Sequence, residues 1–307
     1  MLELGYFLQQ CLNGLSLGML YGLIALGYTM VYGIVGMINF AHGEIFMISA
    51  FLAFLAFVGL QDAGVMSITL CVLGMFLFSM AITAVYGYAL EAVAYKPLRS
   101  APRLAPLITA IGMSILFQNF VQLTQGAQVK ALPPLLTGTN VLGMFDHFAV
   151  TLSDTQIVLF ISTVVTAVVL YAVIHKTPLG RAQRACAQDA KMASLLGILV
   201  NRVIAITFMM GAVGAAVAGV MVTLYYGVLD FYMGFLVGMK AFTAAVLGGI
   251  GSLEGALLGG VLLGLIETLW SAYFGADYKN VAAFGVLIFV LMVRPSGLLG
   301  RPTLEKV

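Results

Sequence analysis

The chain has 307 residues, of which 62% are hydrophobic and only 8% are charged, and its formal net charge is +2. A soluble domain carries about 25% charged residues, because it has to cover itself with polar surface. Twelve acidic and fourteen basic residues are too few to cover a chain of this size, so lipid is the expected solvent for most of it. The composition therefore excludes a soluble enzyme, a disordered regulator and a nucleic-acid-binding protein.

Continuous apolar runs follow one another along the chain. A bilayer core about 30 Å thick is crossed by about 20 apolar residues in a helix. The long runs lie near 11–35, 44–60, 65–94, 104–124, 156–174, 203–225 and 254–274, and shorter ones near 236–250 and 281–293. Continuous runs exclude a membrane barrel, whose strands alternate. The sequence predicts an all-α, polytopic membrane bundle with eight or nine transmembrane segments, and a single domain over 1–307.

The basic residues are distributed unevenly among the connections. They concentrate in the loops 95–103 and 175–202 and in the tail after 293, whereas the alternate connections are acidic or balanced. The positive-inside rule predicts that these basic segments are cytoplasmic and that the N-terminus faces outward. The largest outer connection, 125–155, contains several prolines and glycines and is expected to fold on the outer face, where another protein could dock.

Glycines recur every four residues at two places. One series comprises Gly14, Gly18 and Gly22, and a later one comprises Gly251, Gly255 and Gly259. Small residues at this spacing give a flat helix face that lets two backbones approach closely. The repetition fits an internal duplication, which is common in transporters, but glycine is frequent in any membrane protein, and both explanations stay open.

A polar stretch separates the first two apolar runs. It contains Asn39, Phe40, His42 and Glu44, and its polar groups must face protein, water or the membrane interface, because burial in lipid is costly. Asn39 suits a helix N-cap, and Glu44 suits the first turn of a helix. One interpretation is a capped turn at the interface; the other is a gate or pathway near the inner mouth. A lone His42 fits a hydrogen-bonded structural residue better than a metal ligand.

Three further acidic residues lie in or near apolar runs. Glu91 is close to the end of its run and is expected to reach the interface. Glu254 and Glu267 are further candidates for a pathway or gate, and Glu267 lies deep in its run. Such a residue is either paired inside the bundle or lines a path.

The 175–202 loop predicts two short polar helices. Thr177 and Pro178 form an N-cap and N1 pair for the first helix, which carries Arg184. Asp189 can cap the second helix, which closes at Gly197. Its Met192, Leu195 and Leu196 form one apolar stripe. The stripe lies either on the membrane surface or, as we favour, in a cytoplasmic partner.

Sequence motifs for catalysis and cofactor binding are missing. There is no phosphate-binding G-x-x-x-x-G-K-[ST] loop, and no catalytic triad or carboxylate pair stands out. Cys11, Cys71 and Cys186 are widely spaced and form no metal-ligand pattern. We predict no catalytic residue, no cofactor-binding residue and no metal site.

Four segments resemble one known family. They are GMINFAHGE at 36–44, LGRAQRACAQDAKMASLLGI at 179–198, AFTAAVLGGIGSLEGALLGG at 241–260 and VRPSGLLGRP at 293–302. In this order and spacing they are similar to branched-chain amino acid ABC transporter permeases of the LivH type. The similarity runs from about residue 10 to the end of the chain.

The resemblance implies one of two related permeases in the bacterial inner membrane. It would assemble with a LivM-type sister permease, two cytoplasmic ATPases that use ATP, and a periplasmic amino-acid-binding protein docking on 125–155. Segment 189–197 would be the coupling helix. The resemblance places coupling on Arg184, Asp189, Met192, Leu195, Leu196 and Gly197. The implied cargo is leucine, isoleucine and valine, and the alternative cargoes are another amino acid, an amide or urea. Two other functions, an ion-coupled secondary transporter and a structural scaffold, agree less well with the sequence.

Overall fold

The computed structural model describes residues 2–99, 101–102, 104–145 and 148–300. The helices are α1 (Leu2–Val35), α2 (His42–Asp62), α3 (Ile68–Leu90), α4 (Leu104–Gln125), α5 (Asp154–Lys176), α6 (Pro178–Gln188), α7 (Ala190–Leu195), α8 (Val200–Tyr226), α9 (Met233–Gly248), α10 (Leu253–Tyr273) and α11 (Lys279–Val293). The short strands are β1 (Lys130–Ala131), β2 (Thr139–Phe145), β3 (Phe148–Ser153) and β4 (Val228–Leu229). The loop residue Arg103 and the end of the 293–302 motif lie outside the described residues.

The predicted spans agree with the helices. Seven helices of the described chain are long and apolar enough to cross a membrane, and each coincides with one of the seven long runs. The two shorter runs became α9 and α11, with 16 and 15 residues. The helical membrane fold is confirmed, and eight or nine crossings are reached when one or both short helices also cross.

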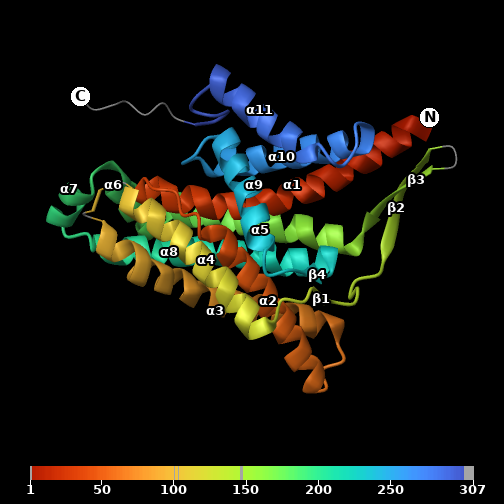
Figure 1. Ribbon diagram of the computed structural model, residues 1–307, viewed down its shortest axis with the longest axis horizontal. Coiled ribbons are helices and arrows are strands. Elements are labelled where there is room, and N and C mark those ends of the chain that lie inside the picture. Colours follow the sequence, from red (N-terminus) through yellow and green to blue (C-terminus); the bar gives the residue numbers. More distant parts are fainter. Residues whose placement is uncertain (1, 100, 103, 146–147, 301–307) are drawn as a thin grey trace.

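The bundle has two distinct ends. The N-terminal part of α1 packs against β3, and its other end reaches α6, while α5 connects β3 directly to α6. Figure 1 accordingly shows the β2–β3 hairpin beside the N-terminus at one end of the molecule and α6 and α7 at the opposite end. Helices α1, α2 and α8 contribute most of the buried apolar core between these ends.

Helices α1 and α10 touch backbone to backbone. A Cβ added at Gly18 would lie 2.6 Å from Cα of Val261, and one added at Gly260 would lie 2.5 Å from Cα of Gly22. The first glycine series therefore faces Gly260 and Gly264 of α10, which confirms the predicted close approach of two backbones. Gly255 and Gly259 of the later series lie instead against Gly248 and Ala244 of α9. The internal duplication stays a prediction.

The 125–155 connection contains the hairpin, which the sequence analysis expected only as a folded loop. Strands β2 and β3 pair antiparallel with an irregularity between Val141 and Gly143, and β1 pairs with β4. The side chain of Gln9 on α1 holds the hairpin by accepting from the Thr151 N–H (2.8 Å) and donating to its carbonyl (3.1 Å). These strands escaped prediction because they are short and because β2 is largely exposed and interrupted by Gly143.

Candidate functional site

The turn between α1 and α2 enters the interior of the bundle. Asn39 is 2% exposed, and its Oδ1 accepts from the backbone N–H of Ala41 (3.1 Å) and from the hydroxyl of Tyr95 (2.8 Å). The N-cap of α2 is Ala41, so the assignment of Asn39 as N-cap was wrong. Its side chain instead closes a turn before the helix and ties that turn to the segment after α3.

Glu44 lies in the first turn of α2, as expected, but not near a membrane surface. Its Oε1 accepts from Ser114 Oγ (2.9 Å) and Gln118 Nε2 (2.7 Å), and its side chain is fully buried. Ser114 stands halfway along α4, which is itself long enough to span the bilayer. The structure therefore places Glu44 deep in the bundle rather than at the inner mouth. Its Oε2 has no hydrogen-bond partner among the described residues.

A cavity of about 200 Å³ adjoins this carboxylate. Ser114, Gln118 and Gly234 line it and also lie against Glu44. The remaining lining is mostly apolar and consists of Tyr28, Phe40, Ile111, Ile115, Tyr232, Phe235, Gly238 and Met239. Phe40, which the sequence motif singled out, therefore lines this cavity. The lining residues of α4 and α9 were not predicted, because their apolar runs resemble those of ordinary lipid-facing helices.

His42 is packed rather than open to a ligand. It is 1% exposed, its ring meets Tyr28 edge-on with centroids 4.9 Å apart, and the absence of a side chain at Gly27 leaves room for Nε2. No group of three or more His, Cys, Asp or Glu residues in the described chain is arranged to hold a metal ion. His42 therefore shapes the wall behind the cavity.

Glu267 is buried and paired. Its Oε1 lies 2.5 Å from Lys240 Nζ and 3.7 Å from Lys279 Nζ, and its Oε2 accepts from the hydroxyl of Tyr21 (2.9 Å). This cluster ties α10 to α9, α11 and α1. Glu267 also borders a polar cavity of about 310 Å³ next to Tyr6 and Lys279. The structure therefore shows the pairing inside the bundle, and because Glu267 also borders this cavity, a position on a path stays a prediction.

Glu267→Leu alone should destabilise the protein more than the double change Glu267→Leu with Lys240→Met. The single variant leaves Lys240, whose side chain is 15% exposed, without its carboxylate, and breaking such a pair costs about 3–5 kcal/mol. Thermal unfolding in detergent measures the difference. Equal Tm values for the single and double variants would show that the pair contributes nothing.

Glu254 does not join either buried cluster. It lies exposed in the first turn of α10, whose N-cap is Ser252, and the Ser252 hydroxyl accepts from the Gly255 N–H (3.1 Å). An acidic residue in the first turn favours the helix dipole. The structure gives this candidate a helix-terminal position and does not bring it to the cavity beside Glu44.

The predicted caps of α6 and α7 are confirmed. Thr177 accepts from the Gly180 N–H (3.3 Å), and Asp189 Oδ1 accepts from the N–H groups of Lys191 (2.9 Å) and Met192 (3.0 Å). Gly197 follows α7 with a positive φ of 84°, which a residue with a side chain rarely adopts.

The apolar stripe of α7 points away from the molecule. Met192, Leu195 and Leu196 are 59%, 75% and 80% exposed, whereas Ala193 on the opposite side is buried in a small cluster with Cys186 and Val203. Arg184 anchors α6 by donating to the backbone carbonyl of Ile174 at the end of α5. Leu199, two residues beyond the predicted end of this helix at Gly197, is also exposed.

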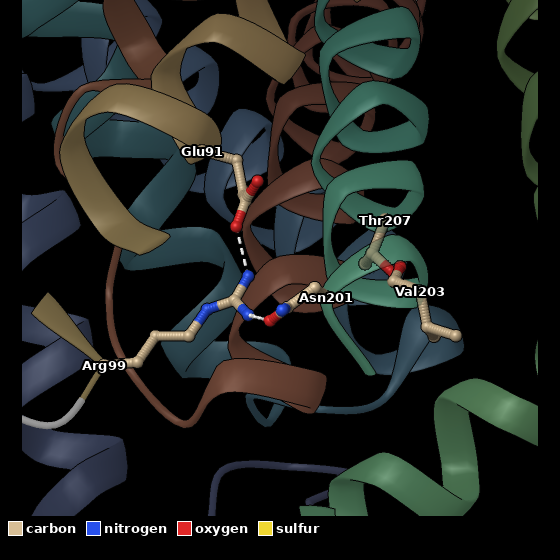
Figure 2. A network of polar contacts seen from close by, with 5 residues as sticks. All are labelled: Glu91, Arg99, Asn201, Val203 and Thr207. Carbon is tan, nitrogen blue, oxygen red and sulfur yellow. Dashed lines mark hydrogen bonds and ion pairs between the residues drawn. The ribbon is translucent and has the colours of Figure 1, made fainter. Parts of the chain in front are cut away.

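A polar network lies at the same end of the bundle. Arg99 donates to the carboxylate of Glu91 and to the side-chain oxygen of Asn201, as Figure 2 shows. Glu91 is therefore buried and paired, contrary to the expectation that it reaches the interface. Glu91 and Arg99 are eight residues apart in the sequence, which is not the spacing of neighbours on a helix, so the sequence did not indicate that they pair. A wide helical turn (Glu91–Tyr95) followed by a tight one (Lys96–Leu98) returns Arg99 to Glu91.

The same network lies beside a second contact. Thr207, one and a half turns along α8 from Asn201, accepts from Gln183 Nε2 of α6 (2.7 Å) and donates to the Val203 carbonyl (2.8 Å). Both contacts converge on the first turns of α8, which directly follow the α7 segment (Figure 2). A displacement of α7 would therefore be transmitted to α3, α5 and α8 together.

Comparison with known proteins places this architecture. The family model described as branched-chain amino acid transport system / permease component matches residues 10–293. The permease LivH of Salmonella typhimurium strain LT2 is 52% identical over 98% of both chains, and BraD of Pseudomonas aeruginosa strain PAO1 is 53% identical over 99% of both. LivH of Methanocaldococcus jannaschii, described as probable, is 26% identical over 91% of this chain and 88% of its own. These relatives are named as transport permeases, and the chain belongs to the branched-chain amino acid transport system permease family.

Proposed function

We propose that this chain is one permease subunit of an ATP-driven importer in the bacterial inner membrane, and that it moves leucine, isoleucine and valine inward. The observation that carries the proposal is the exposed apolar stripe of α7. Met192, Leu195 and Leu196 project from a capped helix at the end of the bundle predicted to be cytoplasmic. A carrier driven by an ion gradient has no use for such a docking helix.

The proposal assigns the partners to the two ends of the bundle. Two cytoplasmic ATPases bind and hydrolyse ATP, and one of them takes α7. A periplasmic amino-acid-binding protein docks on the β2–β3 side, and a LivM-type sister permease completes the pathway. This chain itself holds no cofactor and performs no catalysis. The basic residues Arg181, Arg184 and Lys191 near α7 support the cytoplasmic placement of that end.

The contacts around α7 explain how ATPase motion would reach the membrane. Ala193 packs α7 onto Val203 of α8, and Arg184 fastens α6 to the end of α5. Arg99 couples the start of α8 to Glu91 at the end of α3. A displacement of α7 therefore moves three spanning helices as a unit, as alternation between outward-open and inward-open states requires.

Asn201→Ala should reduce cargo uptake several-fold while the ATPases remain bound. The change removes one acceptor of Arg99 and loosens α8 from the segment after α3, but it leaves the Glu91–Arg99 pair and the α7 stripe intact. Uptake and ATP hydrolysis by the purified assembly measure the effect. Asn119→Ala, at an exposed asparagine on α4 that only bonds its own helix, is the matched control. Unchanged uptake in Asn201→Ala would remove this network from the coupling route.

Uptake into proteoliposomes tests the function as a whole. The assembly of this chain with its sister permease and ATPases should accumulate radiolabelled leucine when ATP is inside and the binding protein is outside. Excess valine or isoleucine should compete, and urea should not. Competition by urea or a simple amide would show that the cargo is one of these compounds rather than a branched-chain amino acid. Uptake by this chain alone under an ion gradient would replace the importer with a secondary transporter.

A further inference from the structure

The cavity lined by α4, α9, Tyr28 of α1 and Phe40 of the turn before α2 has the chemistry of a site for a small zwitterion. We propose that it is a transit site for cargo within the permease, in which Glu44 receives the α-ammonium group and the apolar wall receives the branched side chain. The inference rests on the proposed function, because it takes an aliphatic amino acid as the cargo.

The carboxylate of Glu44 lacks a cation. Its two donors, Ser114 and Gln118, are neutral and both bind Oε1, whereas Oε2 has no hydrogen-bond partner within the part of the chain that the structure describes, although the side chain is fully buried. The buried acids Glu91 and Glu267, in contrast, are each paired with Arg or Lys. A buried carboxylate is costly unless it is paired, so a positively charged guest would be stabilised at this position.

The space next to Oε2 is kept open by glycine. A Cβ added at Gly234 would lie 2.3 Å from Oε2 of Glu44, and Gly234 also lines the cavity. Gln118 both donates to Glu44 and lines the cavity, and it is only half-buried. Rotation of the Gln118 side chain is therefore the smallest movement that opens the carboxylate to a molecule in the cavity.

Two helix N-termini meet at this place. Gly43 in the first turn of α2 lies against Gly234 in the first turn of α9, with 2.4 Å between a Cβ at Gly43 and the Gly234 carbonyl oxygen. Helix N-termini carry partial positive charge, and interrupted helices that meet inside a membrane bind substrate carboxylates in other transporters. The N–H groups of Tyr232 and Met233 at this terminus are already bonded to Asp230, so α9 contributes only its partial charge beside a zwitterion whose ammonium faces Glu44.

The rest of the cavity suits an aliphatic side chain in both chemistry and size. Phe40, Ile111, Ile115, Phe235 and Met239 line it. Its volume of about 200 Å³ is below the roughly 300–1,000 Å³ typical of sites for drug-sized ligands. The small number of polar side chains in this lining is consistent with a site that holds cargo briefly, as a pathway must.

Protection of an introduced cysteine tests the site. Ile115→Cys is made in the full assembly, with Cys11, Cys71 and Cys186 replaced by serine or alanine, and a small thiol reagent is applied to membranes without the binding protein. Leucine at millimolar concentration should slow labelling of the introduced cysteine at least three-fold. 4-Methylpentanoate, which has the leucine skeleton without the amino group, should not slow it.

Matched charge variants identify the group that holds the ammonium. Glu44→Gln should abolish protection by leucine, whereas Glu254→Gln, the same change at an exposed position, should retain it. Met239→Cys repeats the measurement from α9 if Ile115→Cys does not assemble. Equal protection by 4-methylpentanoate, or full protection in Glu44→Gln, would overturn the role of Glu44. Absence of protection at both cysteines in an assembly that imports leucine would overturn the site, while loss of leucine import itself would overturn the proposed function.

Discussion

Leu195→Asp is expected to abolish ATP-driven uptake, with a loss of 100-fold or more, and to release the ATPases during purification. Leu195 is 75% exposed at the centre of the α7 stripe, so the change removes little packing within the chain. In a docked complex, however, it buries a carboxylate against an apolar surface without a partner, which costs several kcal/mol. Co-purification of tagged permease with the ATPases measures the association.

Met66→Asp serves as the control for this variant. Met66 is 96% exposed in the connection between α2 and α3, so an aspartate there adds the same charge to an unpartnered apolar position. It should leave both ATPase association and uptake unchanged. If Leu195→Asp also retains the ATPases and the uptake of the unmodified chain, α7 is not the coupling helix.

Gly264→Ala is expected to lower stability by about 3 kcal/mol or more, although it adds only a methyl group. The new Cβ would lie 2.2 Å from the backbone nitrogen of Gly18 and 2.5 Å from the carbonyl oxygen of Gly14. Neither neighbour has a side chain that can move aside, so α1 and α10 must separate, and overpacking of this kind costs about 1–3 kcal/mol or more. The Tm in detergent should fall by several degrees.

Gly112→Ala provides the comparison. Gly112 is exposed within α4, and a Cβ added there meets nothing within 4 Å. Because alanine favours a helix by up to about 1 kcal/mol over glycine, this variant should be unchanged or slightly more stable. A Gly264→Ala protein as stable as Gly112→Ala would contradict the tight packing of α1 on α10.

The elements of this fold that rest on local rules were predictable from the sequence. Long apolar runs gave the spans, and the glycine spacing gave a close helix contact. The caps at Thr177 and Asp189 followed from residue types adjacent to short polar helices. Each of these signals is contained within one turn or one span, so no knowledge of tertiary contacts was needed.

The parts that depend on how helices are joined in space were not predictable. Glu91 was expected to reach the interface, but an irregular end of α3 turns Arg99 back to it. Glu44 was expected near a surface but bonds to Ser114 at the middle of α4, and Asn39 was expected to cap a helix but is buried against Tyr95. Ser114 and Gln118 were missed because a single polar residue in an apolar run gives no indication of which buried group it meets.

The proposed coupling to an ATPase requires α7 to lie on the cytoplasmic side of the membrane. Ser194→Cys places a thiol on the exposed surface of α7 in a chain whose native cysteines have been replaced. The variant is treated with a membrane-impermeant thiol reagent. No labelling is expected in intact cells, and rapid labelling is expected in inverted membrane vesicles from which the ATPases have been removed. Met144→Cys on β2 is the control for the outer side. Labelling of Ser194→Cys in intact cells at the rate of this control would place α7 outside the cell, where no ATPase could bind it, and would contradict the coupling role of α7.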